Sequence, residues 1–319
     1  FLRVPEEVWG GMREYLLIIF AGLLATSLYN FFSCLLRALG NSTVPLVFLA
    51  VSAILNIAWD LLFVAVFHWG IAGAAYATIF AQYVSGIGIL LYVLFRCRSL
   101  FPERKDLCFD GGILKEIAGL SSLTCLQQSV MNFGILMVQG LVNSFGATTM
   151  AAFAAAVKID TFAYLPVQDF GNAYSTFIAQ NYGAGNKERI RRGTKESFAI
   201  STVFSLVISA LVFAFAAPLM QIFVSSAETA VIASGVRYLR IEGAFYFGIG
   251  CLFLLYGYYR AIKRAEMSVV LTVISLGIRV LLAYVLSATF LGETGIWMAI
   301  PIGWILADLT GLLYMRKTW

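Results

Sequence analysis

The sequence predicts an all-α polytopic membrane protein made of two similar helix bundles, and three observations support this fold class. The chain of 319 residues is 61% hydrophobic and only 12% charged, whereas about a quarter of the residues in a soluble domain are charged. Its apolar residues gather in runs that reach membrane length, for which about 20 residues suffice. Finally, parts of the first bundle recur later in the chain.

Nine apolar runs are the expected membrane spans. They are 15–36, 44–67, 71–95, 117–143, 148–181, 197–223, 236–259, 267–290 and 294–315. The fifth run is too long for one straight crossing and contains Pro166. Because proline lacks an amide N–H and crowds the preceding helical turn, we expect a bend there.

The loops between these runs alternate between basic and nearly uncharged. Most of the 22 Lys and Arg residues lie in the basic loops, at Arg37, Arg96, Arg98, Arg104, Lys105, Lys115, Lys187, Arg189, Arg191, Arg192, Lys195, Arg260, Lys263, Arg264, Arg316 and Lys317. By the positive-inside rule these loops and the C-terminus are cytoplasmic. The net charge of +5 therefore needs no nucleic-acid partner.

An internal repeat indicates two bundles of the same orientation. The tripeptide Arg37-Ala38-Leu39 has a counterpart 223 residues later in Arg260-Ala261-Ile262, and Gly70-Ile71 recurs as Gly295-Ile296. Six spans separate the copies, and an even number of crossings is typical of transporters built from parallel repeats around a cavity. Because counterparts of the three spans between 117 and 223 would precede residue 1, we expect a fragment that lacks about 110 residues.

The sequence lacks several motifs on which enzymes and nucleotide-driven pumps depend. His68 is the only histidine, no two cysteines have CxxC spacing, and no DDxxD, GxGD or GxxxxGK[ST] motif occurs. Catalytic triads, zinc sites and phosphate-binding loops therefore lack their characteristic residues. We predict that the protein is not an enzyme, has no cofactor, and takes any transport energy from an ion gradient, of H⁺ or Na⁺, or from a partner subunit.

Charged residues inside the spans mark the candidate site, because a charge in the bilayer interior is costly unless it faces a cavity or a partner. The expected intramembrane acids are Asp60, Asp160, Asp169, Glu242 and Asp308, and the bases clearly among them are Lys158 and Arg279. This excess of acids suits a cavity that takes up protons, sodium or organic cations.

Each of these charged residues also has a structural interpretation. Asn56 lies one turn before Asp60 on the same helix face, so the pair can hold a cation, pass a proton or simply hydrogen-bond a neighbouring helix. Lys158 and Asp160 point to different faces, so each needs its own partner. Arg279 occupies the place of Asn56 under the 223-residue offset, which makes the two bundles chemically unequal. We further expect Arg237 and Arg240 to pair with Glu242.

Six segments resemble the MATE family of multidrug and toxic-compound exporters, most closely Firmicutes members of the MepA and NorM type. They are Leu35–Pro45, Asn56–Asp60, Gly70–Ala75, Ala155–Asp160, Gln180–Gly185 and Gly295–Pro301. The resemblance covers essentially the whole chain. It implies a two-lobe bundle of the MOP superfamily with twelve helices, of which about nine are present.

The resemblance implies a domain organisation, a location and an activity. Residues 1–95 would be helices four to six of the N-lobe, 96–116 a cytoplasmic inter-lobe loop, and 117–319 the C-lobe. The protein would be a monomer that crosses the bacterial plasma membrane and contacts its lipids. It would export small lipophilic, often cationic compounds in exchange for H⁺ or Na⁺ by alternating access.

The resemblance also implies roles for individual residues. Asp60 matches an acid of the N-lobe cavity, where Na⁺ is a candidate ligand. NorM-type members carry an acid where this chain has Gln127 and Gln128, so a C-lobe sodium site of that kind is doubtful, and Asp160 or Glu242 is the candidate substitute. Two alternatives stay open: a lipid-linked saccharide flippase of the same superfamily, which needs a mainly basic cavity, and an inactive truncated fragment.

Overall fold

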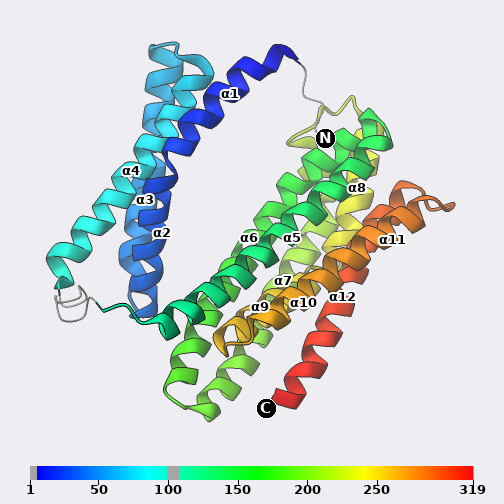
Figure 1. The fold of residues 1–319 in the computed structure, drawn as a ribbon. Coiled ribbons are helices and arrows are strands. Elements are labelled where there is room, and N and C mark those ends of the chain that lie inside the picture. The colour runs from blue at the N-terminus through cyan, green and yellow to red at the C-terminus, as the bar shows by residue number, and fades with distance from the viewer. Residues whose placement is uncertain (1–5, 99–107, 319) are drawn as a thin grey trace. The chain divides into compact units, whose positions relative to one another are not determined.

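The computed structural model describes residues 6–98 and 108–318, and every regular element among them is helical (Figure 1). Seven helices are long and apolar enough to cross a membrane, and two bent helix pairs raise the number of candidate spans to nine. The prediction of an all-α polytopic membrane protein is thus confirmed. The chain divides into two compact units, Phe1–Phe109 and Asp110–Trp319. The assignment of these units to two lobes stays a prediction.

The first unit has α4 at its centre. Helices α1 (Glu6–Ala21) and α2 (Leu23–Ala38) form a pair that is bent by 41° and is together a candidate span. Helix α3 (Thr43–Asp60) continues as the π-helical turn η1 (Leu61–Val66), and α4 (Gly70–Arg96) contacts all of them. The bend falls at Gly22, where a Cβ atom would lie only 2.6 Å from Oε1 of Gln82 on α4. A glycine there lets the bent span approach α4 closely.

The second unit contains the remaining helices. They are α5 (Gly111–Ser144), α6 (Ala147–Gly183), α7 (Lys187–Gln221), α8 (Thr229–Gly243), α9 (Tyr246–Ala261), α10 (Ala265–Thr272), the π-helical turn η4 (Val273–Gly277), α11 (Ile278–Ser287) and α12 (Glu293–Thr318). Helices α8 and α9 form the second bent pair, with an angle of 51° between them, and are together a candidate span. Helix α6 is continuous through Pro166. Non-helical backbone angles occur instead at Phe215 of α7, three residues before Pro218, where the proline ring crowds the preceding turn.

Close contact between α6 and α9 forms the middle of the second unit. A Cβ atom at Gly257 of α9 would lie 2.7 Å from the carbonyl oxygen of Gly171 on α6. The Ser175 hydroxyl also donates a hydrogen bond of 2.9 Å to the Gly257 carbonyl. Helix association in lipid depends on such packing and hydrogen bonds, because lipid tails are as apolar as the side chains. The α6–α9 contact therefore anchors the helices that bear the candidate site.

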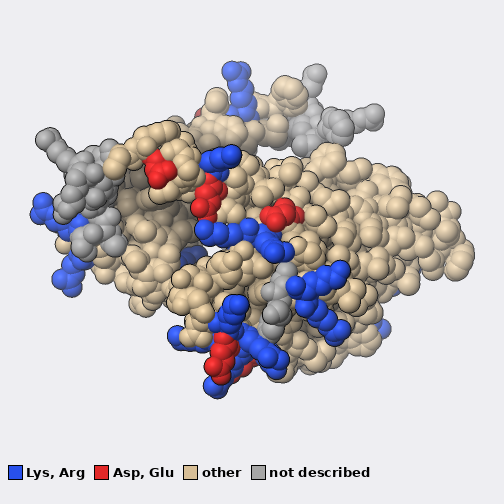
Figure 2. Space-filling view, turned by 60° about the horizontal axis from the view of Figure 1, so that its bottom comes forward, with Lys and Arg blue, Asp and Glu red and all other residues tan. Residues whose placement is uncertain are grey.

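One end of the second unit is basic. Figure 2 is turned toward the end where the α6–α7 turn and the C-terminal end of α12 lie, and Lys and Arg side chains gather there. At the α9–α10 turn, Nζ of Lys263 lies 2.5 Å from the Glu116 carboxylate of α5. The hydrogen bond from Lys263 to that carboxylate raises the pKa of the lysine above its ordinary value. The orientation of this end toward the cytoplasm stays a prediction.

Candidate functional site

Charged and hydroxyl side chains meet in the interior of the second unit, and we call this group the buried polar cluster. It consists of Asp160 on α6, Tyr238 and Glu242 on α8, Tyr246 on α9 and Arg279 on α11. Asp160 and Glu242 keep only 9% and 6% of their surface exposed. Burial of two acids costs desolvation free energy, which hydrogen-bond donors or an opposite charge must offset.

Asp160 receives hydrogen bonds from both sides of the α8–α9 bend. The Tyr238 hydroxyl of α8 donates to its Oδ2 at 2.6 Å. The Tyr246 hydroxyl of α9 donates to its Oδ1. Both tyrosines are buried, and hydrogen bonds to an ionised carboxylate are stronger than those between neutral groups. Each carboxylate oxygen of Asp160 therefore has a positioned donor.

The charges of the cluster do not balance when both acids are ionised. Glu242 lies within electrostatic range of Asp160 and Arg279, so two carboxylates share one guanidinium. Oε2 of Glu242 and Nε of Arg279 are buried without a hydrogen-bond partner in the described part of the chain. One further positive charge would make the cluster neutral. A proton or a small cation is the species that this arrangement can accept.

Aromatic rings pack against the cluster. The Trp297 ring stacks on Phe153 at a centroid distance of 5.5 Å and meets Tyr238 edge-on at 4.9 Å. All three side chains are buried. An apolar wall of this kind lowers the local dielectric and strengthens charge interactions inside it.

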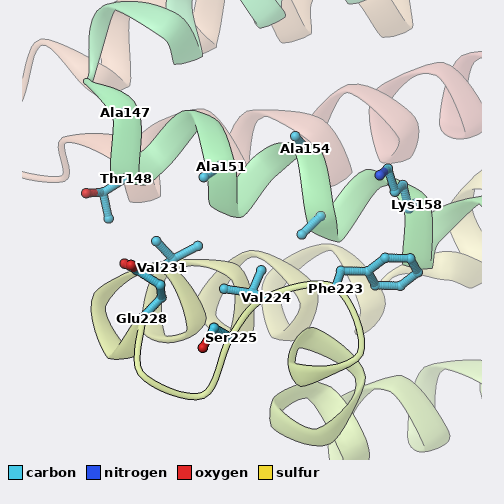
Figure 3. A pocket seen from close by; sticks show the side chains of 11 residues that line it. Ala147, Thr148, Ala151, Ala154, Lys158, Phe223, Val224, Ser225, Glu228 and Val231 are labelled. Atoms are coloured by element: carbon cyan, nitrogen blue, oxygen red, sulfur yellow. The ribbon is translucent and has the colours of Figure 1, made fainter.

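Three predicted site residues of the second unit lie outside the cluster. Lys158 is exposed on another face of α6, and its Nζ lies 5.6 Å from the centre of the Phe223 ring. On α5, Gln127 is buried and Gln128 exposed, and neither is a hydrogen-bonding partner recorded for Asp160. Lys158 instead lines a groove beside the α7–α8 turn (Figure 3).

The predicted pair in the first unit lies on α3. Nδ2 of Asn56 and an oxygen of Asp60 are both buried without a hydrogen-bond partner among the described residues. Asp60 is the last residue of α3, and the π-helical turn η1 begins directly after it. Such turns often occur beside functional groups. No group of three or more His, Cys, Asp or Glu that could hold a metal occurs among the described residues, and Na⁺ near Asp60 stays a prediction.

The two tyrosines of the cluster were not predicted from the sequence as site residues. Tyr238 and Glu242 are four residues apart on one face of α8, and this spacing could have indicated that they lie together. The position of Tyr246 depends on the bend between α8 and α9. The expected pairing of Arg237 and Arg240 with Glu242 is wrong. Arg237 instead pairs with Glu293 of α12 at 3.2 Å, and Arg240 lies 5.4 Å from the Phe213 ring of α7.

Comparisons with known proteins agree on one family. The MatE family model matches residues 1–62 and 123–285. The chain is 33% identical to "Probable multidrug resistance protein YpnP" of Bacillus subtilis, over 99% of this chain and 70% of that protein. It is 27% identical to "Probable multidrug resistance protein NorM" of Thermotoga maritima, over 98% and 68%. The fold is similar to that of a mutant of the Vibrio cholerae MATE transporter VcmN, with a TM-score of 0.91, 23% identity, and coverage of 99% and 72%.

Proposed function

This chain belongs to the MatE family of membrane transporters, and on that premise we propose that it acts in cation-coupled export. The cargo would be small lipophilic, often cationic compounds, and H⁺ or Na⁺ would move in the opposite direction. The observation that supports this proposal is the buried polar cluster, in which two carboxylates share one guanidinium.

The cluster supplies a physical reason for coupling. A buried site with an uncompensated negative charge is costly, so it favours the uptake of one cation. A proton on Asp160 or Glu242 would remove that cost. Asn56 and Asp60 are the second candidate for cation or cargo binding, because Nδ2 of Asn56 and Oδ1 of Asp60 are buried without partners among the described residues. The proposed location is the bacterial plasma membrane, with the C-terminus cytoplasmic and the protein monomeric.

The direct test follows ethidium efflux from an efflux-deficient bacterium that expresses the full-length protein. The proton gradient and the sodium gradient are collapsed separately, and we expect efflux to stop with only one of them, which identifies the coupling ion. Asp160→Asn and Asp60→Asn should each abolish efflux while membrane abundance is retained. Asp169→Asn is the matched control, because Asp169 is an exposed acid on the same helix as Asp160.

Other outcomes would change the proposal. Retained efflux in either Asn variant would remove that acid from the coupling site. No efflux from an abundant, membrane-inserted wild-type protein would favour a different cargo, with a lipid-linked saccharide as the next candidate. The acid excess of the cluster argues against that cargo, because an anionic lipid head needs a mainly basic cavity.

A further inference from the structure

Another groove, of about 470 Å³, lies in the second unit where the first turns of α5 meet the α9–α10 turn, and we call it the interfacial groove. Its lining residues from α5 are Lys115, Glu116, Gly119, Leu120 and Leu123. They recur every three to four positions, so they form one stripe along the helix. Lys263 and Glu266 form the opposite wall. None of these residues belongs to the buried polar cluster or to the groove that contains Lys158.

The four charged residues of the interfacial groove lie outside the expected apolar runs. Two of them precede the run 117–143, and the other two lie between the runs 236–259 and 267–290. Because apolar runs end at the border of the hydrocarbon layer, these charges lie at the level of the lipid head groups. Leu123 follows Lys115 by eight residues, which is roughly 12 Å further along the helix. The groove thus passes from charged residues at the interface to apolar residues at acyl-chain depth.

One positive and one negative charge of the interfacial groove are left for a ligand. Nζ of Lys263 lies 2.5 Å from Oε1 of Glu116, so these two charges neutralise each other. Lys115 and Glu266 are exposed, and neither has an ion-pair partner among the described residues. They stand on different helices, α5 and α10. The groove therefore offers one cation and one anion, from opposite walls, to a molecule that carries both charges.

We propose that the interfacial groove binds phosphatidylethanolamine, with the lipid phosphate at Lys115 and the ammonium group at Glu266. Hydrogen bonds between charged groups are stronger than those between neutral groups, so the two contacts fix the head group. An acyl chain of the lipid would lie along Leu120 and Leu123, which are half-buried. It would pass Gly119, where a Cβ atom would meet nothing within 4 Å and the wall of the groove is open.

Other membrane lipids match the interfacial groove less well. Phosphatidylglycerol has a phosphate but no ammonium group, so it would leave Glu266 unpaired beside a second anion. A primary ammonium has three N–H donors for a carboxylate, whereas the quaternary ammonium of phosphatidylcholine has none. A water-soluble phosphate ester has no chain to cover the leucines. Both the charges and the apolar wall therefore favour phosphatidylethanolamine.

The test measures lipid binding to the purified, delipidated full-length protein by native mass spectrometry. The dioleoyl forms of phosphatidylethanolamine, phosphatidylcholine and phosphatidylglycerol are titrated separately, so that the three lipids differ only in their head groups. We expect wild-type protein to bind phosphatidylethanolamine about five- to tenfold more tightly than either other lipid, because only its ammonium group donates a hydrogen bond to Glu266.

Substitutions at the two unpaired charges separate the head-group contacts. Glu266→Gln should remove the preference for phosphatidylethanolamine over phosphatidylcholine, and Glu266→Asp should retain it. Lys115→Gln should weaken the binding of all three lipids, since each has a phosphate. Arg264→Gln is the matched control, because Arg264 lies in the same α9–α10 turn but donates a hydrogen bond of 2.6 Å to the Tyr314 hydroxyl and does not line the groove.

A bulky side chain in the interfacial groove tests the apolar wall. Gly119→Trp should weaken the binding of every lipid, because its ring would occupy the path of the acyl chain. Gly140→Trp is the control, since Gly140 lies on the same helix, a Cβ atom there also meets nothing within 4 Å, and the residue does not line the groove. A midpoint of thermal unfolding close to that of the wild type shows that both variants are folded.

Four results would overturn the inference. Two are equal affinities of the wild-type protein for phosphatidylethanolamine and phosphatidylcholine, and an unchanged preference in Glu266→Gln. The third is tighter binding of phosphatidylglycerol, which would make the groove a site for anionic lipids. The fourth is binding of glycerophosphoethanolamine as tightly as the lipid, which would make it a site for soluble phosphate esters. Lipid binding is measured without transport, so absence of ethidium efflux would refute the export function and leave this lipid site unaffected.

Discussion

Asp160 and Glu242 are buried acids with different surroundings. Asp160 has a tyrosine donor on each oxygen, whereas one oxygen of Glu242 is buried without a partner among the described residues. Arg279 lies within electrostatic range of both. These three residues were conspicuous in the sequence, because charges are rare inside apolar runs. The two tyrosines were not, because tyrosine is common in membrane helices and its hydroxyl partner depends on how α6, α8 and α9 pack.

Arg279→Gln should destabilise the protein by about 3 kcal/mol, because it leaves two buried carboxylates without their cation. A lower midpoint of thermal unfolding in detergent would measure the loss. Adding Glu242→Gln to this variant should restore part of the stability, since only one acid then remains. Strictly additive effects of the two substitutions would contradict a charge interaction between Glu242 and Arg279.

At the scale of elements, the two bent spans break at equivalent places. The α1–α2 bend falls at Gly22 and the α8–α9 bend at Ala244 and Phe245, which matches the 223-residue spacing of the repeat. Apolar run length predicted the spans, because charged residues and glycines end most of them. It did not predict these two bends, since neither contains proline. The bend depends on what the helix packs against, as the contact between Gly22 and Gln82 illustrates.

Gly257→Ala should destabilise the second unit, because the added methyl group would lie 2.7 Å from the Gly171 carbonyl oxygen and force α6 and α9 apart. We expect a loss of about 1–3 kcal/mol, the usual range for overpacking, measured as a lower unfolding temperature. Gly140→Ala is the control, since a Cβ atom there meets nothing within 4 Å. That substitution should be neutral or stabilising, by up to about 1 kcal/mol. Equal losses in both variants would refute the packing argument.

At the scale of the whole molecule, the sequence repeat predicted two related bundles but not how far they differ. The bends lie at equivalent positions of the two bundles, but the π-helical turns do not. Turn η1 begins directly after Asp60, whereas η4 ends two residues before Arg279. A contact that was not predicted from the sequence joins α6, α8 and α12 in the second unit. Glu293 of α12 accepts hydrogen bonds from Thr149 of α6 and from Ser234 and Arg237 of α8.

Glu293→Ala should lower the stability of the protein by about 1–3 kcal/mol, because one substitution removes the acceptor for three donors on two helices. The midpoint of thermal unfolding of purified protein measures this effect. Glu196→Ala provides the comparison, since Glu196 pairs with Arg192 on an exposed face of one helix. Exposed pairs of this type contribute about 0.3–0.5 kcal/mol. A Glu293→Ala variant no less stable than Glu196→Ala would show that the three-helix contact is not stabilising.

The position of Asp160 between two tyrosines has a thermodynamic consequence. Tyr238 and Tyr246 lie on opposite sides of the 51° break between α8 and α9, so a change of bend angle must alter the distance from Asp160 to at least one hydroxyl. Binding of a proton or cation to the Asp160 carboxylate is therefore linked to the angle between α8 and α9. Reciprocity requires that whatever binds at Asp160 shifts the preferred angle by the same free energy with which the angle shifts binding. Binding of a proton or cation at Asp160 would therefore favour one angle between α8 and α9 over another.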